Sequence, residues 1–352
     1  MFKAITFLLL IVVCSPPAVL SQTPTPPPQP ESGPGGKARA HSAVTRNRYR
    51  EGAKEYWIYE PDSPKPRTAP VVVFLHGWGG TNPLYYGAWI DHLVKRGNIV
   101  VFPRYQSSVL TPRAHFIPNT IEAVKDAIER LEKQPGHVRP ELNKIAAVGH
   151  SLGGILAASL AALAAESGIP PVRAVMAVEP GMTSEPASVP MADLKKIPAD
   201  TLLLAVAGDR DTFVSDIDAK KIYYESTRVS ADNKDFVTLV TDDHGTPGLI
   251  ANHRAPTAPD KSYDNGEGDR TAPRESSSGE GRTNGPTTQS TRLPVINALD
   301  YYGLWKLFDG LCDAAFYQKN REYALGNTSQ QRFMGRWSDG VAVKELIITD
   351  KP

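Results

Sequence analysis

The stretch Ile145-Ala-Ala-Val-Gly149-His150-Ser151-Leu152-Gly153-Gly154 decides the fold of this chain. It is an apolar strand pattern that runs through Gly-x-Ser-x-Gly directly into an Ala- and Leu-rich helix pattern, residues 151–166. A tight turn from strand to helix holds a serine in a strained conformation and exposes its hydroxyl at the sheet edge. The glycines leave room where backbones come close, and the helix N-terminus points N–H groups at a developing oxyanion. The segment therefore predicts Ser151 as a nucleophile.

Short apolar runs on both sides of this segment predict the strands of one sheet. Most are continuously apolar, which is typical of strands buried on both faces of a mainly parallel sheet. Helix-period patterns separate them, most clearly residues 121–131, which follow a cap at Asn119-Thr120. This alternation predicts an α/β fold, with a mainly parallel central sheet flanked by helices. The predicted strands are residues 55–59, 71–75, 99–102, 145–148, 174–178, 201–205 and 236–240.

Two of the later strands end in turns that carry an acid and a histidine. Gly208-Asp209-Arg210-Asp211 follows strand 201–205, and Thr241-Asp242-Asp243-His244 follows strand 236–240. An acid and then a histidine, in that chain order after the serine, complete a hydrolytic triad on a sheet of this kind. We therefore predict Asp211 as the acid and His244 as the base.

Three alternatives stay open at this point. Asp209 shares its turn with Asp211, and one of the two carboxylates can cap the following helix instead. Glu179 ends the strand at 174–178 and is another candidate acid. His253 is the rival base, but it lies well beyond the strand end.

An early Gly-rich turn predicts the second half of an oxyanion hole. Val71-Val-Val-Phe-Leu75-His76-Gly77-Trp78-Gly79-Gly80 is a strand that ends in such a turn, and the N–H groups of Trp78 and Leu152 are the expected donors. His76 precedes the turn and is interpreted as a structural residue. Tyr85 and Tyr86 line a substrate pocket or belong to the core, and the sequence favours neither.

These motifs together resemble the α/β-hydrolase superfamily, in particular its esterase, lipase and dienelactone-hydrolase-like groups. The resemblance covers residues 54–316 and implies a Ser-His-Asp triad that hydrolyses carboxylic esters through an acyl-enzyme. Dienelactone hydrolases carry a nucleophilic cysteine where this chain has Ser151, which favours ordinary esters. The short connection at residues 181–198 predicts an open site without a large lid domain. A serine peptidase and a non-catalytic binding protein on the same fold are the alternative functions.

The ends of the chain predict its organisation. Residues 1–21 have one early Lys and a short apolar run, as in a cleaved signal peptide, which implies a secreted or periplasmic protein. Residues 22–52 are rich in Pro and Gly and predict a flexible spacer. The hydrolase domain then spans residues 53–352. Within it, residues 254–292 are polar and Gly-rich and predict a loosely ordered insertion.

The composition bears on which partners and cofactors to expect. The 352 residues carry 39 basic and 38 acidic side chains, a net charge of +1, which gives no support for a nucleic-acid partner. No Cys/His cluster or acidic loop has the spacing of a metal site, so neither metal nor organic cofactor is expected. Of the two cysteines, Cys312 is expected to be a buried apolar residue. The expected ligand is a small-molecule ester; the oligomeric state is not predicted.

Overall fold

The computed structural model describes residues 23–183, 188–267 and 294–352. These residues form a nine-stranded sheet in the order β1-β2-β4-β3-β5-β6-β7-β8-β9. The run from β4 to β8 in this order is parallel, while β1, β2 and β9 pair antiparallel to their neighbours. The strands are β1 (Ala43–Tyr49), β2 (Tyr56–Asp62), β3 (Thr68–Leu75), β4 (Ile99–Pro103), β5 (Arg139–His150), β6 (Val172–Val178), β7 (Leu202–Gly208), β8 (Lys234–Leu239) and β9 (Ile347–Thr349).

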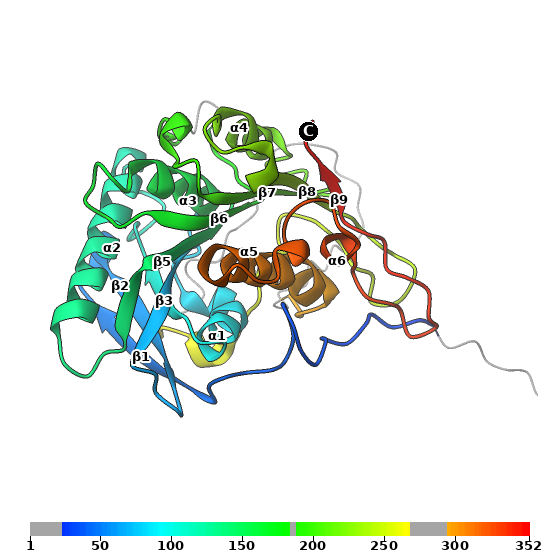
Figure 1. Ribbon diagram of the computed structural model, residues 1–352, viewed down its shortest axis with the longest axis horizontal. Helices are drawn as coiled ribbons and strands as arrows, with labels where there is room; N and C mark the ends of the chain where they lie inside the picture. The colour runs from blue at the N-terminus through cyan, green and yellow to red at the C-terminus, as the bar shows by residue number, and fades with distance from the viewer. Residues whose placement is uncertain (1–22, 184–187, 268–293) are drawn as a thin grey trace, which may run out of the picture.

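Helices cover both faces of this sheet (Figure 1). Successive side chains of a strand point to opposite faces, so Val71 and Val73 join one core while Val72 and Phe74 join the other. Side chains of α2, α3 and α4 fill the first core, and those of α1 and α5 fill the second. The predicted α/β class with a mainly parallel sheet is confirmed. The helices are α1 (Gly87–Lys95), α2 (Phe116–Lys133), α3 (Leu152–Leu163), α4 (Ile217–Glu225), α5 (Trp305–Tyr317) and α6 (Ser329–Arg332).

The predicted flexible spacer, residues 22–52, is wrong for its described part. Its second half contains β1, which pairs along its whole length with β2. Its first half lies along the C-terminal part of the chain (Figure 1). There the Pro27 carbonyl accepts from Tyr301 Oη, and the Gly35 N–H donates to Asp309 Oδ2 at 2.7 Å. Proline lowers the conformational entropy of the unfolded chain, and the backbone carbonyls of a Pro-rich segment remain free to accept hydrogen bonds. A Pro-rich segment can therefore be ordered when it packs on another surface of the protein.

The predicted insertion at residues 254–292 is only partly described. Residues up to 267 are ordered, with Ala258 and Tyr263 buried against α1 and its surroundings, so this portion is not loose; the remainder lies outside the described residues. The expected helix around Val295–Phe316 is present as a π-helical turn, Leu299–Leu304, that continues into α5. Cys312 is buried in α5, as predicted.

The connection between β6 and β7 is short. It contains a single 3-10 turn, Leu194–Lys196, in its described part. The predicted signal peptide, residues 1–21, lies outside the described residues. Among the residues that are described, no helix is long and apolar enough to cross a membrane.

Candidate active site

Ser151 occupies the sharp turn between β5 and α3. Its backbone has φ 56° and ψ −124°, which is a strained conformation for a non-glycine residue. The turn needs glycine on both sides: a Cβ on Gly149 would lie 2.0 Å from the Gly153 carbonyl oxygen, and one on Gly153 would lie 2.1 Å from the Leu75 carbonyl oxygen. The Ser151 N–H donates to the Val178 carbonyl at 2.9 Å. The local sequence thus dictates a rigid turn that presents the Ser151 hydroxyl.

A continuous hydrogen-bonded chain joins Ser151, His253 and Asp211. Ser151 Oγ lies 3.0 Å from His253 Nε2, and His253 Nδ1 lies 2.8 Å from Asp211 Oδ2. Since a carboxylate only accepts, the proton of the ring sits on Nδ1 and leaves the Nε2 lone pair facing the serine. The other carboxylate oxygen of Asp211 accepts from the N–H groups of Phe213 and Val214 at 2.9 and 3.1 Å. These two hydrogen bonds hold the Asp211 carboxylate in place, so that it can orient the His253 ring.

His244 does not take the position predicted for it. Its side chain is 36% exposed and its Nε2 lies 2.8 Å from Asp339 Oδ2, on the surface. His253, the alternative base, occupies the place next to Ser151.

The reason is a hairpin that the chain forms after β8. Asp242 and Leu249 pair as an antiparallel bridge with two hydrogen bonds of 2.8 Å, so the residues between them leave the sheet and return. His244 lies on this excursion. After the return, the Ala251 carbonyl accepts from the Arg210 N–H at 3.0 Å. That contact brings the following residues, and with them His253, to the turn that carries the acid.

Asp209 has a different partner from Asp211. Its two carboxylate oxygens accept from the N–H and the hydroxyl of Thr241 at 2.9 and 2.6 Å. Asp209 therefore ties the end of β7 to the end of β8, while Asp211 is the carboxylate bonded to His253.

The Gly-rich turn after β3 lies next to Ser151. A Cβ on Gly77 would lie 3.3 Å from Ser151 Cβ. The N–H of Gly77 donates to Tyr86 Oη at 3.0 Å and that of Gly79 to Gln106 Oε1 at 3.1 Å. No acceptor for the N–H of Trp78 or of Leu152 is found in the described parts of the chain. Both N–H groups are therefore without a partner within the described residues.

The two tyrosines named as pocket candidates differ in burial. Tyr86 is 2% exposed and its ring packs on Phe74 and Phe102, so it belongs to the core and does not line a pocket. Tyr85 is half-buried and packs against the same core. His76 is buried, stacked on Tyr105 and faces the carbonyls of Gly77 and Arg104, as expected for a structural residue. Burial lowers its pKa to about 4.

His150 supports the site in a way that the sequence reading missed. Its Nε2 donates to the backbone carbonyl of His253 at 2.9 Å, and its Nδ1 accepts from Tyr86 Oη at 2.9 Å. Burial holds the pKa of His150 well below its usual value. The ring is therefore neutral, so one nitrogen can donate a hydrogen bond while the other accepts one. The only sign of this role in the sequence was the place of His150 inside the Gly-x-Ser-x-Gly motif, which puts its ring beside Ser151.

A group of His150, Glu179 and His253 lies close enough together to suggest a metal site. The hydrogen bonds argue against one. His150 Nε2 and His253 Nδ1, which face Glu179 at 3.7 and 3.8 Å, each carry a hydrogen directed to another acceptor. A metal ligand needs a free lone pair on nitrogen, and in this hydrogen-bonded arrangement neither of these two nitrogens offers one.

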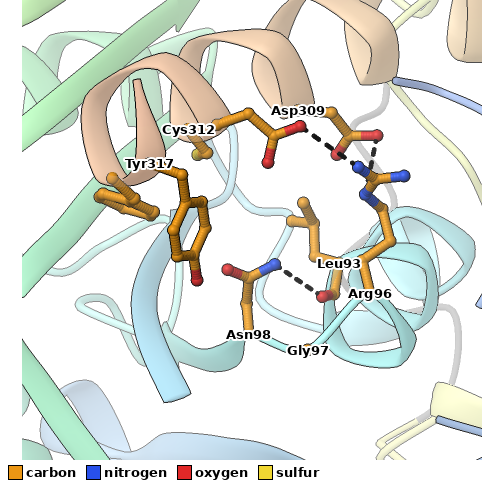
Figure 2. Close-up of a pocket in the computed structure, with 9 residues that line it drawn as sticks. Leu93, Arg96, Gly97, Asn98, Asp309, Cys312 and Tyr317 are labelled. Carbon is orange, nitrogen blue, oxygen red and sulfur yellow. Dashed lines mark hydrogen bonds and ion pairs between the residues drawn. The ribbon is translucent and has the colours of Figure 1, made fainter. Parts of the chain in front are cut away.

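A small cavity lies elsewhere, between α1 and α5. It has a volume of about 50 Å³, far below the 300–1,000 Å³ typical of ligand pockets. Figure 2 shows Arg96 directed at Asp309, and the nitrogen–oxygen distance between them is 3.2 Å. Arg96 also pairs with Asp313 at 3.6 Å. Asp309 also accepts from His92 and from Gly35, which belongs to the segment before β1, residues 23–42, here called the N-terminal strap. We interpret this region as a structural ion network.

Two comparisons with known proteins agree with this geometry. A family model described as chlorophyllase matches residues 36–192, a region that contains Ser151 but neither Asp211 nor His253. Esterase LipI of Mycobacterium tuberculosis (strain ATCC 25618 / H37Rv) is 34% identical over 124 residues, which are 34% of this chain and 37% of that protein. The match thus spans little more than a third of that relative. Together with the sheet topology and the turn at Ser151, these findings support an α/β-hydrolase superfamily for this chain.

Proposed function

We propose that this chain is a serine hydrolase that cleaves carboxylic esters, with Ser151 as nucleophile, His253 as general base and Asp211 as the acid that orients it. The observation that carries the proposal is the hydrogen-bonded chain from Ser151 Oγ through His253 to Asp211, with distances of 3.0 and 2.8 Å. The matching relative named an esterase supports ester substrates.

The mechanism follows from these positions. His253 Nε2 takes the proton of the Ser151 hydroxyl as the oxygen attacks the ester carbonyl, and Asp211 stabilises the imidazolium. The N–H groups of Trp78 and Leu152 then donate to the tetrahedral oxyanion; each such donor typically contributes ~10²–10³ in rate. His253 next protonates the leaving alcohol, and water activated by the same ring releases the acid from Ser151.

The surroundings of His253 favour an ester with an apolar portion. The ring of Phe213 lies 4.9 Å from that of His253, yet the residue is 65% exposed. An exposed aromatic face beside the general base is a contact surface for the apolar part of a substrate. Export through a cleaved signal peptide, residues 1–21, is part of the same proposal.

The test is the variant Ser151→Ala, assayed on short-chain nitrophenyl esters and with a fluorophosphonate probe. We expect hydrolysis to fall by about 10⁴-fold or more, because the nucleophile is lost, and labelling to disappear. Ser230→Ala, at an exposed serine, is the matched control and should retain both. Unchanged hydrolysis and labelling in Ser151→Ala would overturn the proposal. Faster cleavage of peptide than of ester substrates by the unmodified chain would assign a peptidase instead.

A further inference from the structure

Glu179 is a buried carboxyl group that the mechanism above does not use. It directly follows the last residue of β6, Val178, and is 0% exposed. Neither of its carboxyl oxygens has a hydrogen-bond partner among the described residues. A buried polar group without a partner is costly and rare in native proteins, so its presence beside the triad requires an explanation.

The position of Glu179 relates it to His253. Its Oε2 lies 3.8 Å from His253 Nδ1, the nitrogen whose hydrogen is donated to Asp211 at 2.8 Å. The backbone holds the residue in place, because Glu179 has φ 43° and its N–H donates to the Val206 carbonyl at 2.7 Å. A shift of about 1 Å would bring the carboxyl oxygen within hydrogen-bond range of Nδ1.

The groups that face Glu179 determine its charge. They are His150 at the end of β5, Asp211 after β7, His253 after β8 and the Tyr86 hydroxyl. Burial and then the negative charge of Asp211 raise the pKa of Glu179 well above its usual value. Two carboxyl groups near one imidazole do not both ionise readily, so this surrounding favours the protonated form of Glu179.

We propose that Glu179 is a positioning residue for His253, a reserve acid that accepts the Nδ1 hydrogen when Asp211 cannot. This inference rests on the proposed function. In a chain that lacks the Asp211 carboxylate, the Glu179 carboxyl loses its proton to solvent and Oε2 takes over as the acceptor from Nδ1. The ring then keeps the tautomer in which Nε2 faces Ser151.

The experiment is a double-mutant cycle on kcat/KM for a nitrophenyl ester. Removing the acid of a triad that has one acid costs ~10⁴-fold. We expect Asp211→Ala to cost only about 10²-fold and Glu179→Gln less than about 10-fold, while the double variant loses ~10⁴-fold. Asp211→Asn serves as a second variant if the loss of the contacts to Phe213 and Val214 impairs folding, which circular dichroism would show. Asp209→Asn, in the same turn but bonded to Thr241, is the matched control and should remain within a few-fold of the unmodified chain.

The pH profile separates this role from a purely structural one. Activity of Asp211→Ala requires Glu179 to be ionised, so the rising limb of its profile should move to higher pH than in the unmodified chain. The shift should vanish in the double variant. Equal losses from Glu179→Gln in the presence and absence of Asp211, or no alkaline shift, would overturn the inference. If Ser151→Ala retains activity, the proposed function itself is wrong. Additive losses in the Asp211 and Glu179 variants would contradict only the role of Glu179, so the two failures can be told apart.

Discussion

The two histidines that follow β8 have opposite environments. The side chain of His253 is 19% exposed and faces Asp211, whose own side chain is fully buried. The side chain of His244 is 36% exposed and faces Asp339, which is equally exposed. Both are histidine–aspartate pairs with nitrogen–oxygen distances of 2.8 Å. The pair alone therefore does not identify a base; what distinguishes His253 is the third contact, to Ser151 Oγ.

The comparison also shows how the fold selects between neighbours in sequence. His244 comes first after the strand, but the hairpin closed by Asp242 and Leu249 carries it away from the sheet edge. The N-terminal strap holds that hairpin from outside, since the Thr246 N–H donates to the Pro24 carbonyl at 2.8 Å. His253 follows the return strand and reaches the site. Three predictions test this difference.

The largest expected effect separates the two histidines directly. His253→Ala should lower kcat/KM by on the order of 10⁴- to 10⁶-fold, because the general base is lost. His244→Ala, its matched control, should stay within about 2-fold, because a surface pair away from the nucleophile makes no contact with reacting atoms. Ester hydrolysis by both purified variants is the measurement. A large loss in His244→Ala with little loss in His253→Ala would reverse the assignment.

A smaller effect is expected at the anchor of the hairpin. Asp242 is buried and accepts from Trp337 Nε1 at 3.0 Å, from the Lys344 N–H at 2.9 Å and from the His244 N–H at 3.1 Å. Asp242→Ala leaves these donors without an acceptor and should lower the free energy of unfolding by about 2–3 kcal/mol at pH 7. Urea unfolding measures this loss.

The same variant has a defined pH dependence. Burial raises the pKa of Asp242, but hydrogen bonds from Lys344, Trp337 and His244 outweigh it, so the pKa is lowered overall. The carboxylate thus stabilises the fold above its unfolded pKa of about 4, and this contribution is lost as the pH falls through the folded pKa. The difference between Asp242→Ala and the unmodified chain should shrink below about pH 4. Asp243→Ala, at the exposed neighbour, is the control and should change neither the free energy of unfolding nor its pH dependence. An equal loss of stability in Asp243→Ala would contradict the role of Asp242 as the anchor of the hairpin.

The smallest effect is expected at the partner of His244. Asp339→Ala removes a surface ion pair, and such pairs contribute little in water and less in salt. Both kcat/KM and the urea midpoint should remain within error of the unmodified chain, with or without added salt. A fall in activity would connect His244 to the site after all.

The fold and part of the site follow from local sequence patterns. Each of the seven predicted strands corresponds to a strand of the sheet, because short, continuous apolar runs between helix-period segments are typical of strands buried on both faces of a parallel sheet. The turn at Ser151 is also visible in the local sequence, since Gly149 is needed within the strand-to-helix corner itself, while Gly153 leaves room for the backbone of β3 at Leu75. β1 was missed because an edge strand buries little and its sequence, Ala43–Tyr49, shows no apolar face.

The sequence by itself determined the mainly parallel sheet, the position of Ser151 and the turn that carries Asp211, because each depends on residues within one strand and its adjoining turn. Only the tertiary structure decided which histidine meets Ser151, which neighbouring acid supports it, and that the Pro-rich strap is ordered. Those choices depend on hydrogen bonds between distant segments, such as Arg210 to Ala251, Thr246 to Pro24 and Trp337 to Asp242. A local sequence pattern does not reveal contacts between segments so far apart along the chain. Their free energy is gained only after the chain has closed the loops between those segments.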